Sequence, residues 1–334
     1  MKAYTPSSLA LVGLVAGVAG ATLLLGLAVG LLRPGKLARL LSWVLVLASV
    51  AGTERLVAAE PAGFRMLALC TVLLFAMKAV VTVETDEPAR GLRWLGFAAA
   101  WPGMRPELFR TAFGPALPGA TALAVKALVR LAIGAALFGA ARLVWARTGS
   151  RVAATALALP GISLVLHFGL LNLAGALWRA LGVDATPLFR APLLATSLDE
   201  FWGKRWNLAF SEMTARAVYR PVGGWLGRKT GLVAAFGFSG LLHELAISVP
   251  VQRGYGLPLL YFLLHGLLML VEKGLLARRA PGHGHPASSH LEAPPWRGRA
   301  WTTFWLVAPI LLLFHPAFLE GVVWPLLGTE GAPA

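Results

Sequence analysis

The sequence contains eight stretches of about 20 or more predominantly apolar residues, separated by polar or basic segments. A helix of about 20 residues crosses the hydrocarbon core of a bilayer, because each residue lengthens it by about 1.5 Å. With 57% hydrophobic and only 13% charged residues among 334, the chain carries too little charge for a soluble protein. We therefore predict an all-α, polytopic membrane helix bundle of about eight transmembrane helices, forming one domain over 1–334. The expected spans are 8–32, 37–58, 61–83, 117–141, 152–178, 230–250, 255–276 and 300–326.

Two long segments between the spans do not fit a simple loop. Residues 84–116 and 179–229 are rich in tryptophan, proline and basic side chains. Irregular backbone inside a membrane protein is tolerated where it packs against protein or lines a cavity. We expect both segments to be re-entrant or interfacial.

The net charge of +15 indicates a membrane orientation, because the basic residues are unevenly distributed. If the N-terminus lies outside, the inner loops hold 20 of the Lys and Arg residues and the outer loops hold 7. In membrane proteins, basic residues concentrate in cytoplasmic loops. This rule explains the positive net charge, so no nucleic-acid partner is expected. The single cysteine, Cys70, excludes an internal disulfide framework. The bias towards Ala, Gly, Leu and Arg favours a bacterial source, and hence a multi-pass protein of the bacterial inner membrane.

Aromatic and cationic side chains are concentrated just before Asn207. Trp202, Lys204, Arg205 and Trp206 follow one another within five positions. One interpretation is an interfacial helix that places its rings at the lipid headgroups and its cations towards anionic lipid. The other is a cytoplasmic vestibule that binds a phosphate-rich substrate such as coenzyme A, since Arg and Lys suit phosphates.

His243 lies 36 positions after Asn207, about 13 residues into the sixth span. That places it roughly 20 Å deep at ~1.5 Å per residue. An ionisable side chain at such a depth is a candidate functional residue. A base and a polar orienting group are what acyl transfer to an alcohol requires. A histidine that only bonds a neighbouring carbonyl is the alternative, and His243 and Asn207 can meet only if 196–229 folds back into the bundle.

Other motifs are weaker. His265 and Glu272 lie seven positions apart on one helix face, where they either line the same cavity or hold two helices together. Ile247 stands where a zinc protease helix needs its second histidine. Three histidines lie in a Pro, Gly and Ser loop that is expected to be solvated, so no metal site is expected; these are His283, His285 and His290.

The order of these motifs resembles the wax synthase branch of the membrane-bound O-acyltransferases. The similarity is strong over about 190–275 and weaker elsewhere. It rests on Ser197-Leu-Asp-Glu-Phe-Trp-Gly-Lys-Arg-Trp-Asn207, Arg216-x-x-Tyr219-x-Pro221, Ser239-Gly-Leu-Leu-His-Glu244, Leu264-His-Gly266 with Glu272, and the Trp94 to Pro106 stretch.

The resemblance implies a catalytic pair, His243 and Asn207. It also implies acyl-CoA as a co-substrate entering from the cytoplasm, a lipid-soluble alcohol entering from the membrane, and no bound cofactor. His243 is then the general base and Asn207 orients the acceptor or polarises the acyl carbonyl. The substrate-binding residues are expected to be Trp202, Lys204, Arg205, Trp206, Tyr219, His265 and Glu272.

The function expected from the sequence is therefore a wax-ester-synthase-like acyltransferase of lipid metabolism. Related activities remain open, namely O-acetylation of a glycan and acylation of a sterol or of diacylglycerol. Outside enzymes, a proton-coupled transporter would also use an intramembrane histidine and glutamate.

The charge distribution predicts the topology directly. A reporter fused at position 288 should be cytoplasmic and one at the C-terminus extracytoplasmic, because the 20-to-7 split places the basic loops inside. Paired alkaline phosphatase and fluorescent protein fusions measure this. Reversed signals from the two positions would invert the orientation.

Overall fold

The computed structural model describes residues 2–279 and 294–328, with side chains described up to 274 and again from 294. Positions 283, 285, 288 and 290 and the C-terminus lie outside these ranges. The chain forms two compact units, here called unit 1 (1–188, 245–253 and 316–334) and unit 2 (189–244 and 254–315). All regular elements in the described ranges are helical, as predicted.

The predicted spans are confirmed as helices. Within the described residues, seven helices are long and apolar enough to cross a membrane, and an interrupted helix gives an eighth candidate. The chain is thus an integral membrane protein. The last predicted span, 300–326, is interrupted after Leu313 and resumes as a helix at Pro316. The seven continuous candidates are Leu9–Gly30, Lys36–Val57, Ala62–Val83, Ala120–Thr148, Arg151–Ala180, Arg228–Val251 and Leu257–Gly274.

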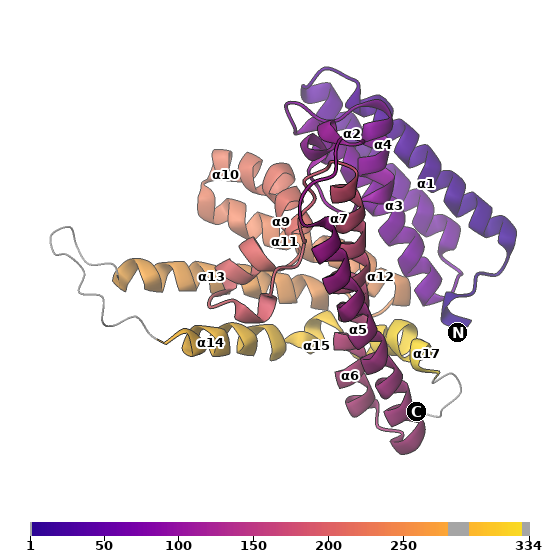
Figure 1. The fold of residues 1–334 in the computed structure, drawn as a ribbon, viewed down its shortest axis with the longest axis vertical. Helices are drawn as coiled ribbons and strands as arrows, with labels where there is room; N and C mark the ends of the chain where they lie inside the picture. The colour runs from indigo at the N-terminus through magenta and orange to yellow at the C-terminus, as the bar shows by residue number, and fades with distance from the viewer. Residues whose placement is uncertain (1, 280–293, 329–334) are drawn as a thin grey trace. The chain divides into compact units, whose positions relative to one another are not determined.

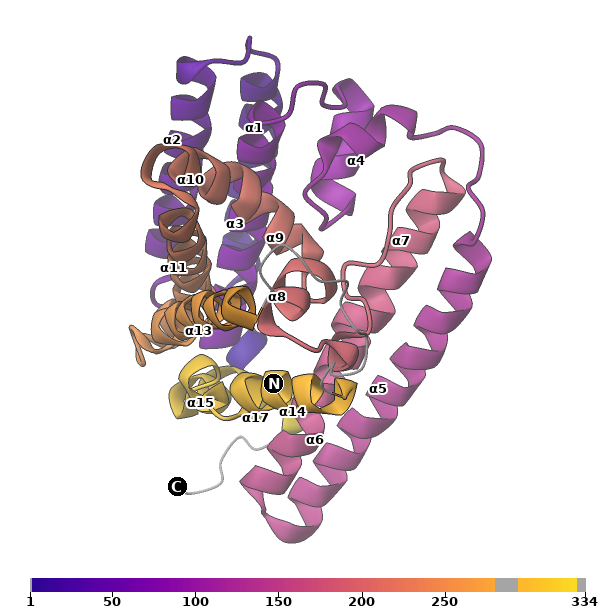
Figure 2. The same cartoon turned by 90° about the vertical axis from the view of Figure 1, so that its left-hand side faces the viewer.

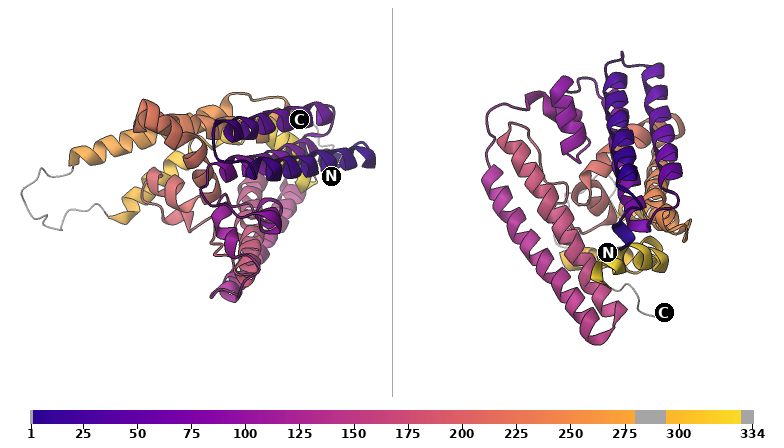
Figure 3. Two further views of the ribbon diagram at one scale, coloured as in Figure 1. Left: turned by 90° about the horizontal axis from the view of Figure 1, so that it is seen from above. Right: turned by 90° about the vertical axis from the view of Figure 1, so that its right-hand side faces the viewer.

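Unit 1 begins with three membrane helices that lie side by side, as Figures 1 and 3 show. The third is the central one, since 67% of its most apolar stretch is buried against 17% for the first. An ion pair of 2.7 Å joins Arg39 to Glu84, and a second joins Arg65 to Glu54. These helices are α1 (Leu9–Gly30), α2 (Lys36–Val57) and α3 (Ala62–Val83), preceded by η1 (Lys2–Tyr4).

A long helical hairpin forms the second large part of unit 1. In Figure 2 its first arm, α5, lies along the second arm, which runs from α6 into α7. Pro160 lies near the end of α6 and removes one backbone N–H, and the π-helical stretch η3 follows. The elements are α5 (Ala120–Thr148), α6 (Arg151–Ser163), η3 (Leu164–Leu170) and α7 (Leu171–Ala180), with α12 (Ser248–Val251), α16 (Pro316–Phe318), η7 (Leu319–Val323) and α17 (Trp324–Leu327).

Unit 2 consists of short helices followed by longer ones. The chain from 189 to 226 forms a succession of short α- and π-helical pieces, where the sequence predicted an interfacial or re-entrant segment. They include η4 (Pro192–Leu194), α8 (Leu198–Glu200), η5 (Phe201–Arg205), α9 (Leu208–Thr214), η6 (Ala215–Tyr219) and α10 (Arg220–Leu226). The longer part consists of α11 (Arg228–Ala246), α13 (Leu257–Arg279), α14 (Pro295–Val307) and α15 (Ile310–Leu313). Helix α13 packs against α8 and α15.

The other irregular segment, 84–116, packs inside unit 1 as α4 (Gly91–Ala100) and η2 (Pro106–Thr111). Its tryptophans Trp94 and Trp101 are buried. Lys78 of α3 reaches this segment, where its Nζ donates to the carbonyls of Trp101 at 2.6 Å and Gly103 at 2.5 Å. The Lys78 side chain has no exposed surface. It therefore satisfies two carbonyls just beyond the end of α4.

Replacing Lys78 should lower the stability of unit 1 without directly altering the residues of unit 2. Lys78→Met leaves two buried carbonyls without their donor, so the free energy of unfolding should fall by about 2–4 kcal/mol. Thermal unfolding of the detergent-purified protein measures this. Lys126→Met, which alters an exposed lysine of α5, is the matched control. Equal stability of the two variants would contradict the role given to Lys78.

Candidate active site

His243 projects from α11 towards α13. The two helices come close at Gly240, where a Cβ atom would lie 2.8 Å from the Leu259 Cα. The imidazole packs between two tilted rings, with centroids 4.2 Å from Phe262 and 5.2 Å from Phe210. Its neighbour Glu244 faces away and caps α13 by accepting from the backbone N–H of Gly256 and Leu259. His243 is therefore the ionisable group that α11 presents on this face.

A backbone carbonyl selects the tautomer of His243. The Nδ1 atom lies 2.7 Å from the Ser239 carbonyl oxygen, one helical turn earlier. A carbonyl can only accept, so Nδ1 carries the hydrogen. In the neutral imidazole the lone pair is then on Nε2. This arrangement orients His243 as a base that acts through Nε2.

Asn207 lies at a turn between η5 and α9, with a left-handed backbone (φ +43°). Asparagine tolerates this conformation better than most residues. Its side-chain oxygen accepts from the Phe210 backbone N–H at 3.3 Å and caps α9. With the oxygen engaged in this way, the amide nitrogen is the group available to donate.

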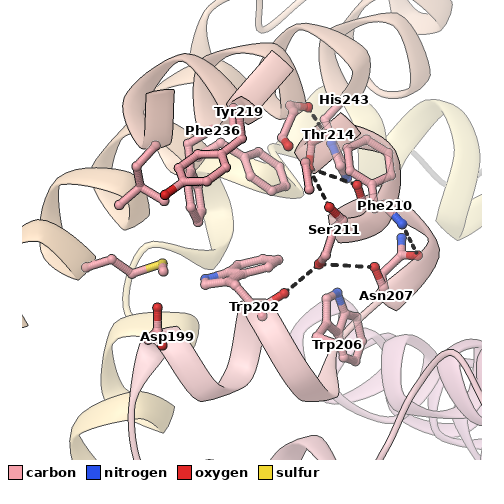
Figure 4. Close-up of a pocket in the computed structure, with 17 residues that line it drawn as sticks. Asp199, Trp202, Trp206, Asn207, Phe210, Ser211, Thr214, Tyr219, Phe236 and His243 are labelled. Carbon is pink, nitrogen blue, oxygen red and sulfur yellow. Dashed lines mark hydrogen bonds between the residues drawn. The ribbon is translucent and has the colours of Figure 1, made fainter. Parts of the chain in front are cut away.

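Ser211 connects the two elements that flank Asn207. Its hydroxyl donates to the Trp202 carbonyl in η5 at 2.6 Å and lies 3.5 Å from the Asn207 carbonyl (Figure 4). Trp206 caps the end of η5, where its backbone N–H donates to the Phe201 carbonyl at 2.8 Å. Local hydrogen bonds thus define the path of the chain on both sides of Asn207.

These elements line an open-sided cavity of about 210 Å³ within unit 2. Most of its lining is aromatic or aliphatic, and the polar side chains include both His243 and Asn207, as Figure 4 shows. An apolar cavity with a few convergent polar groups is typical of a small-molecule site. The lining residues are Asp199, Trp202, Gly203, Trp206, Asn207, Phe210, Ser211, Thr214, Ala215, Tyr219, Leu232, Ala235, Phe236, Ser239, His243, Phe262 and Met269.

The cavity brings together five of the nine residues singled out from the sequence: His243, Asn207, Trp202, Trp206 and Tyr219. The other four lie elsewhere. Lys204 is exposed to solvent, and Arg205, His265 and Glu272 are held in contacts outside the cavity wall.

Arg205 forms an ion pair of 2.6 Å with Glu200. Its guanidinium also donates to the carbonyls of Arg190 and Ala191. The backbone N–H of Thr196, and then Arg205, lower the pKa of Glu200 below its ordinary value, against the opposing effect of burial. A carboxylate with a lowered pKa stabilises the fold above the unfolded value, near pH 4.5. That contribution is lost as the pH falls through the lower folded value.

Glu272 connects α13 to the start of α8. Its carboxylate accepts from the backbone N–H of Leu198 at 3.1 Å and from the Trp301 indole at 2.7 Å. His265 is completely buried, donates from Nδ1 to the Tyr261 carbonyl at 2.7 Å, and packs edge-on against Trp202. Both residues support the segment that carries Trp202 and Asn207.

Sequence reasoning missed several lining residues that a helical period would have identified. Starting from Asn207 or His243, steps of three and four positions trace one face of each helix. The first face, along α9 and into η6, consists of Asn207, Phe210, Ser211, Thr214 and Ala215. The second face, along α11, consists of Leu232, Ala235, Phe236, Ser239 and His243.

Glu272→Ala should lower stability before it alters substrate binding. The change leaves the Leu198 N–H and the Trp301 indole without their acceptor, which costs about 2–4 kcal/mol. Thermal unfolding of purified variants measures the loss. Glu272→Gln keeps one acceptor oxygen and should be intermediate. If Glu272→Ala unfolds like wild type and only weakens substrate binding, the supporting role is wrong.

Comparisons with known proteins match the segment of the chain that lines much of this cavity. Residues 185–264 match the sequence profile of the membrane bound O-acyl transferase family. The chain is 32% identical over 151 residues to a protein of Arabidopsis thaliana named probable long-chain-alcohol O-fatty-acyltransferase 9, covering 42% of each chain. It is 39% identical over 105 residues to the long-chain-alcohol O-fatty-acyltransferase of Simmondsia chinensis, covering 28% of this chain and 29% of the relative.

The chain thus aligns with less than half of the length of these relatives. The matched segment nevertheless contains Trp202, Asn207 and His243. The resemblance seen in the motifs is confirmed over this segment: residues 185–264 are similar to the membrane bound O-acyl transferase family, and the matching relatives are named as long-chain-alcohol O-fatty-acyltransferases.

Proposed function

We propose that the protein transfers an acyl group from acyl-CoA to a lipid-soluble alcohol, as a wax-ester synthase does. The observation that carries this proposal is the Ser239–His243 hydrogen bond, which leaves Nε2 as the basic nitrogen in a cavity that also holds Asn207. The names of the relatives, which describe O-acyl transfer to long-chain alcohols, support the same reaction.

His243 acts as the general base. Its Nε2 takes the proton from the acceptor hydroxyl as the alcohol oxygen attacks the thioester carbonyl carbon. The C–S bond then breaks, and the thiolate of coenzyme A takes the proton back from the imidazolium. The products are an ester and free coenzyme A. A thiolate leaves readily, so the reaction needs no covalent enzyme intermediate.

Asn207 stabilises the negative oxygen that forms during this attack. Its side-chain oxygen is engaged in capping α9, and its amide nitrogen can donate to the former carbonyl oxygen. The left-handed turn and the Ser211 bridge hold the amide in place. Preorganised donors of this kind accelerate reactions because they do not have to reorient as charge develops.

The cavity wall suits the alkyl part of a substrate. Trp202, Phe236, Phe262 and Met269 offer apolar surface beside the two reactive side chains. Lys204, which is exposed, and Arg205, which lies on the same short helix, are proposed to face the phosphates of the donor. His265 and Glu272 then contribute to substrate binding by positioning Trp202.

The concentration of basic residues in the inner loops supports a cytoplasmic location for residues 179–229, on the side where acyl-CoA is available. We propose a multi-pass protein of the bacterial inner membrane with both termini outside. The acceptor would enter from the lipid phase. Esters of a fatty alcohol are the expected product, and sterol, diacylglycerol or glycan esters are the competing outcomes in lipid analysis of an expressing host fed with alcohols.

Variants of the pair test the mechanism. His243→Ala should lower kcat about 10²–10⁴-fold, the usual loss for a general base. Asn207→Asp keeps an acceptor for the Phe210 N–H but removes the amide donor, so kcat should fall about 10²–10³-fold while the protein stays folded. Turnover of acyl-CoA by the purified protein measures both effects.

His167→Ala is the matched control, because it removes another histidine from a membrane helix of unit 1. Its turnover should stay within a few-fold of wild type. A His243→Ala protein that kept more than about a tenth of wild-type turnover would exclude His243 as the base.

A further inference from the structure

The turn between α10 and α11 carries exposed apolar side chains. We call residues 220–229 the basic tip. Trp225 is 88% exposed and Leu226 is 59% exposed at the end of α10, next to the Gly227 turn. A tryptophan at such a position is typical of the boundary between lipid and water. Arg228 begins the sixth candidate membrane span, so the basic tip lies at the end of that span.

The charge of the basic tip is entirely positive. Arg220, Arg228 and Lys229 are exposed, and the sequence has no Asp or Glu between Met213 and His243. Cations next to the end of a membrane helix attract the anionic headgroups of the bilayer surface. The exposed indole of Trp225 and the side chain of Leu226 add apolar surface beside these cations. Lipid acyl chains would cover this surface, whereas a soluble phosphate compound would not.

The basic tip is closely coupled to the cavity. Gly227 makes the turn with a positive φ of +88°, and the chain reverses so that Gly223 of α10 lies close to Gly231 of α11. At Gly231 a Cβ atom would lie 2.8 Å from both the Gly223 Cα and the Tyr219 carbonyl oxygen. Tyr219 and Leu232, which line the cavity, therefore adjoin the two arms of this tight hairpin.

We propose that the basic tip is a binding site for anionic phospholipid headgroups. Arg220, Arg228 and Lys229 contact the phosphates, and Trp225 and Leu226 insert among the upper acyl chains. Occupancy by lipid fixes the hairpin and hence the part of the cavity wall that Tyr219 and Leu232 form. The effect on turnover rests on the proposed acyltransferase function, whereas lipid binding itself does not.

The binding test uses native mass spectrometry of the purified full chain titrated with phosphatidylglycerol or with phosphatidylcholine. Each cation near an anionic surface strengthens binding about fivefold, so Arg228→Gln with Lys229→Gln should weaken phosphatidylglycerol binding about 25-fold. Phosphatidylcholine binding should change little. The control is Arg142→Gln with Arg147→Gln, which neutralises two exposed arginines near the end of α5.

Equal losses in the test and control pairs would overturn the proposal, because they would show a general attraction to the cationic protein. No preference of the wild-type protein for phosphatidylglycerol would overturn it as well. Trp225→Ala should weaken binding of both lipids, since it removes the inserted ring and leaves the charges.

Turnover provides the second readout, in vesicles of phosphatidylcholine with and without phosphatidylglycerol. Wild type should be faster with the anionic lipid, and the test pair should lose this difference. A raised acyl-CoA KM for the test pair in pure phosphatidylcholine would instead assign these cations to the donor and overturn the lipid site. A wild-type protein without turnover that still prefers phosphatidylglycerol would contradict only the proposed function.

Discussion

The hydrocarbon interior of a bilayer offers no partners to backbone N–H and carbonyl groups, and this constraint shapes both units. Long helices satisfy it within themselves. The irregular segments satisfy it through side chains, as Lys78 does for the carbonyls of Trp101 and Gly103 and Glu272 does for the N–H of Leu198. Each device allows a non-helical piece of chain to be packed inside protein. The turn that holds Asn207 follows the same rule, since the Asn207 carbonyl accepts from the backbone N–H groups of Phe210 and Ser211.

The same constraint explains the composition of the cavity. Most of its wall is apolar side-chain surface, and several of its polar groups are bound to nearby backbone, as Ser211 is to the Trp202 carbonyl. His243 and Asn207 each use one polar atom for such a local bond and retain another for a ligand. In each of these two side chains, one polar atom holds the local structure and the other can contact a substrate.

Much of this arrangement could be predicted from the sequence. Apolar stretches of the right length located the membrane helices, and an ionisable residue deep in one of them singled out His243. Stepping along α9 and α11 with helical period would have added Ser211 and Phe236. The engagement of Arg205 with Glu200, and of Glu272 with Leu198, could not be predicted in this way. Those contacts depend on how irregular turns fold, and a charged side chain near a motif looks the same whether it binds a ligand or a neighbour.

The Ser239–His243 hydrogen bond has a kinetic consequence for the proposed reaction. With Nδ1 bound to a carbonyl and the ring packed against Phe262, the imidazole must accept and return its proton through one nitrogen. The hydroxyl of the acceptor and the sulfur of the donor must both come within reach of that nitrogen during a single turnover. Such an enzyme works only when both substrates are bound together. Its rate law is that of a ternary complex, in which neither product forms before the second substrate has arrived.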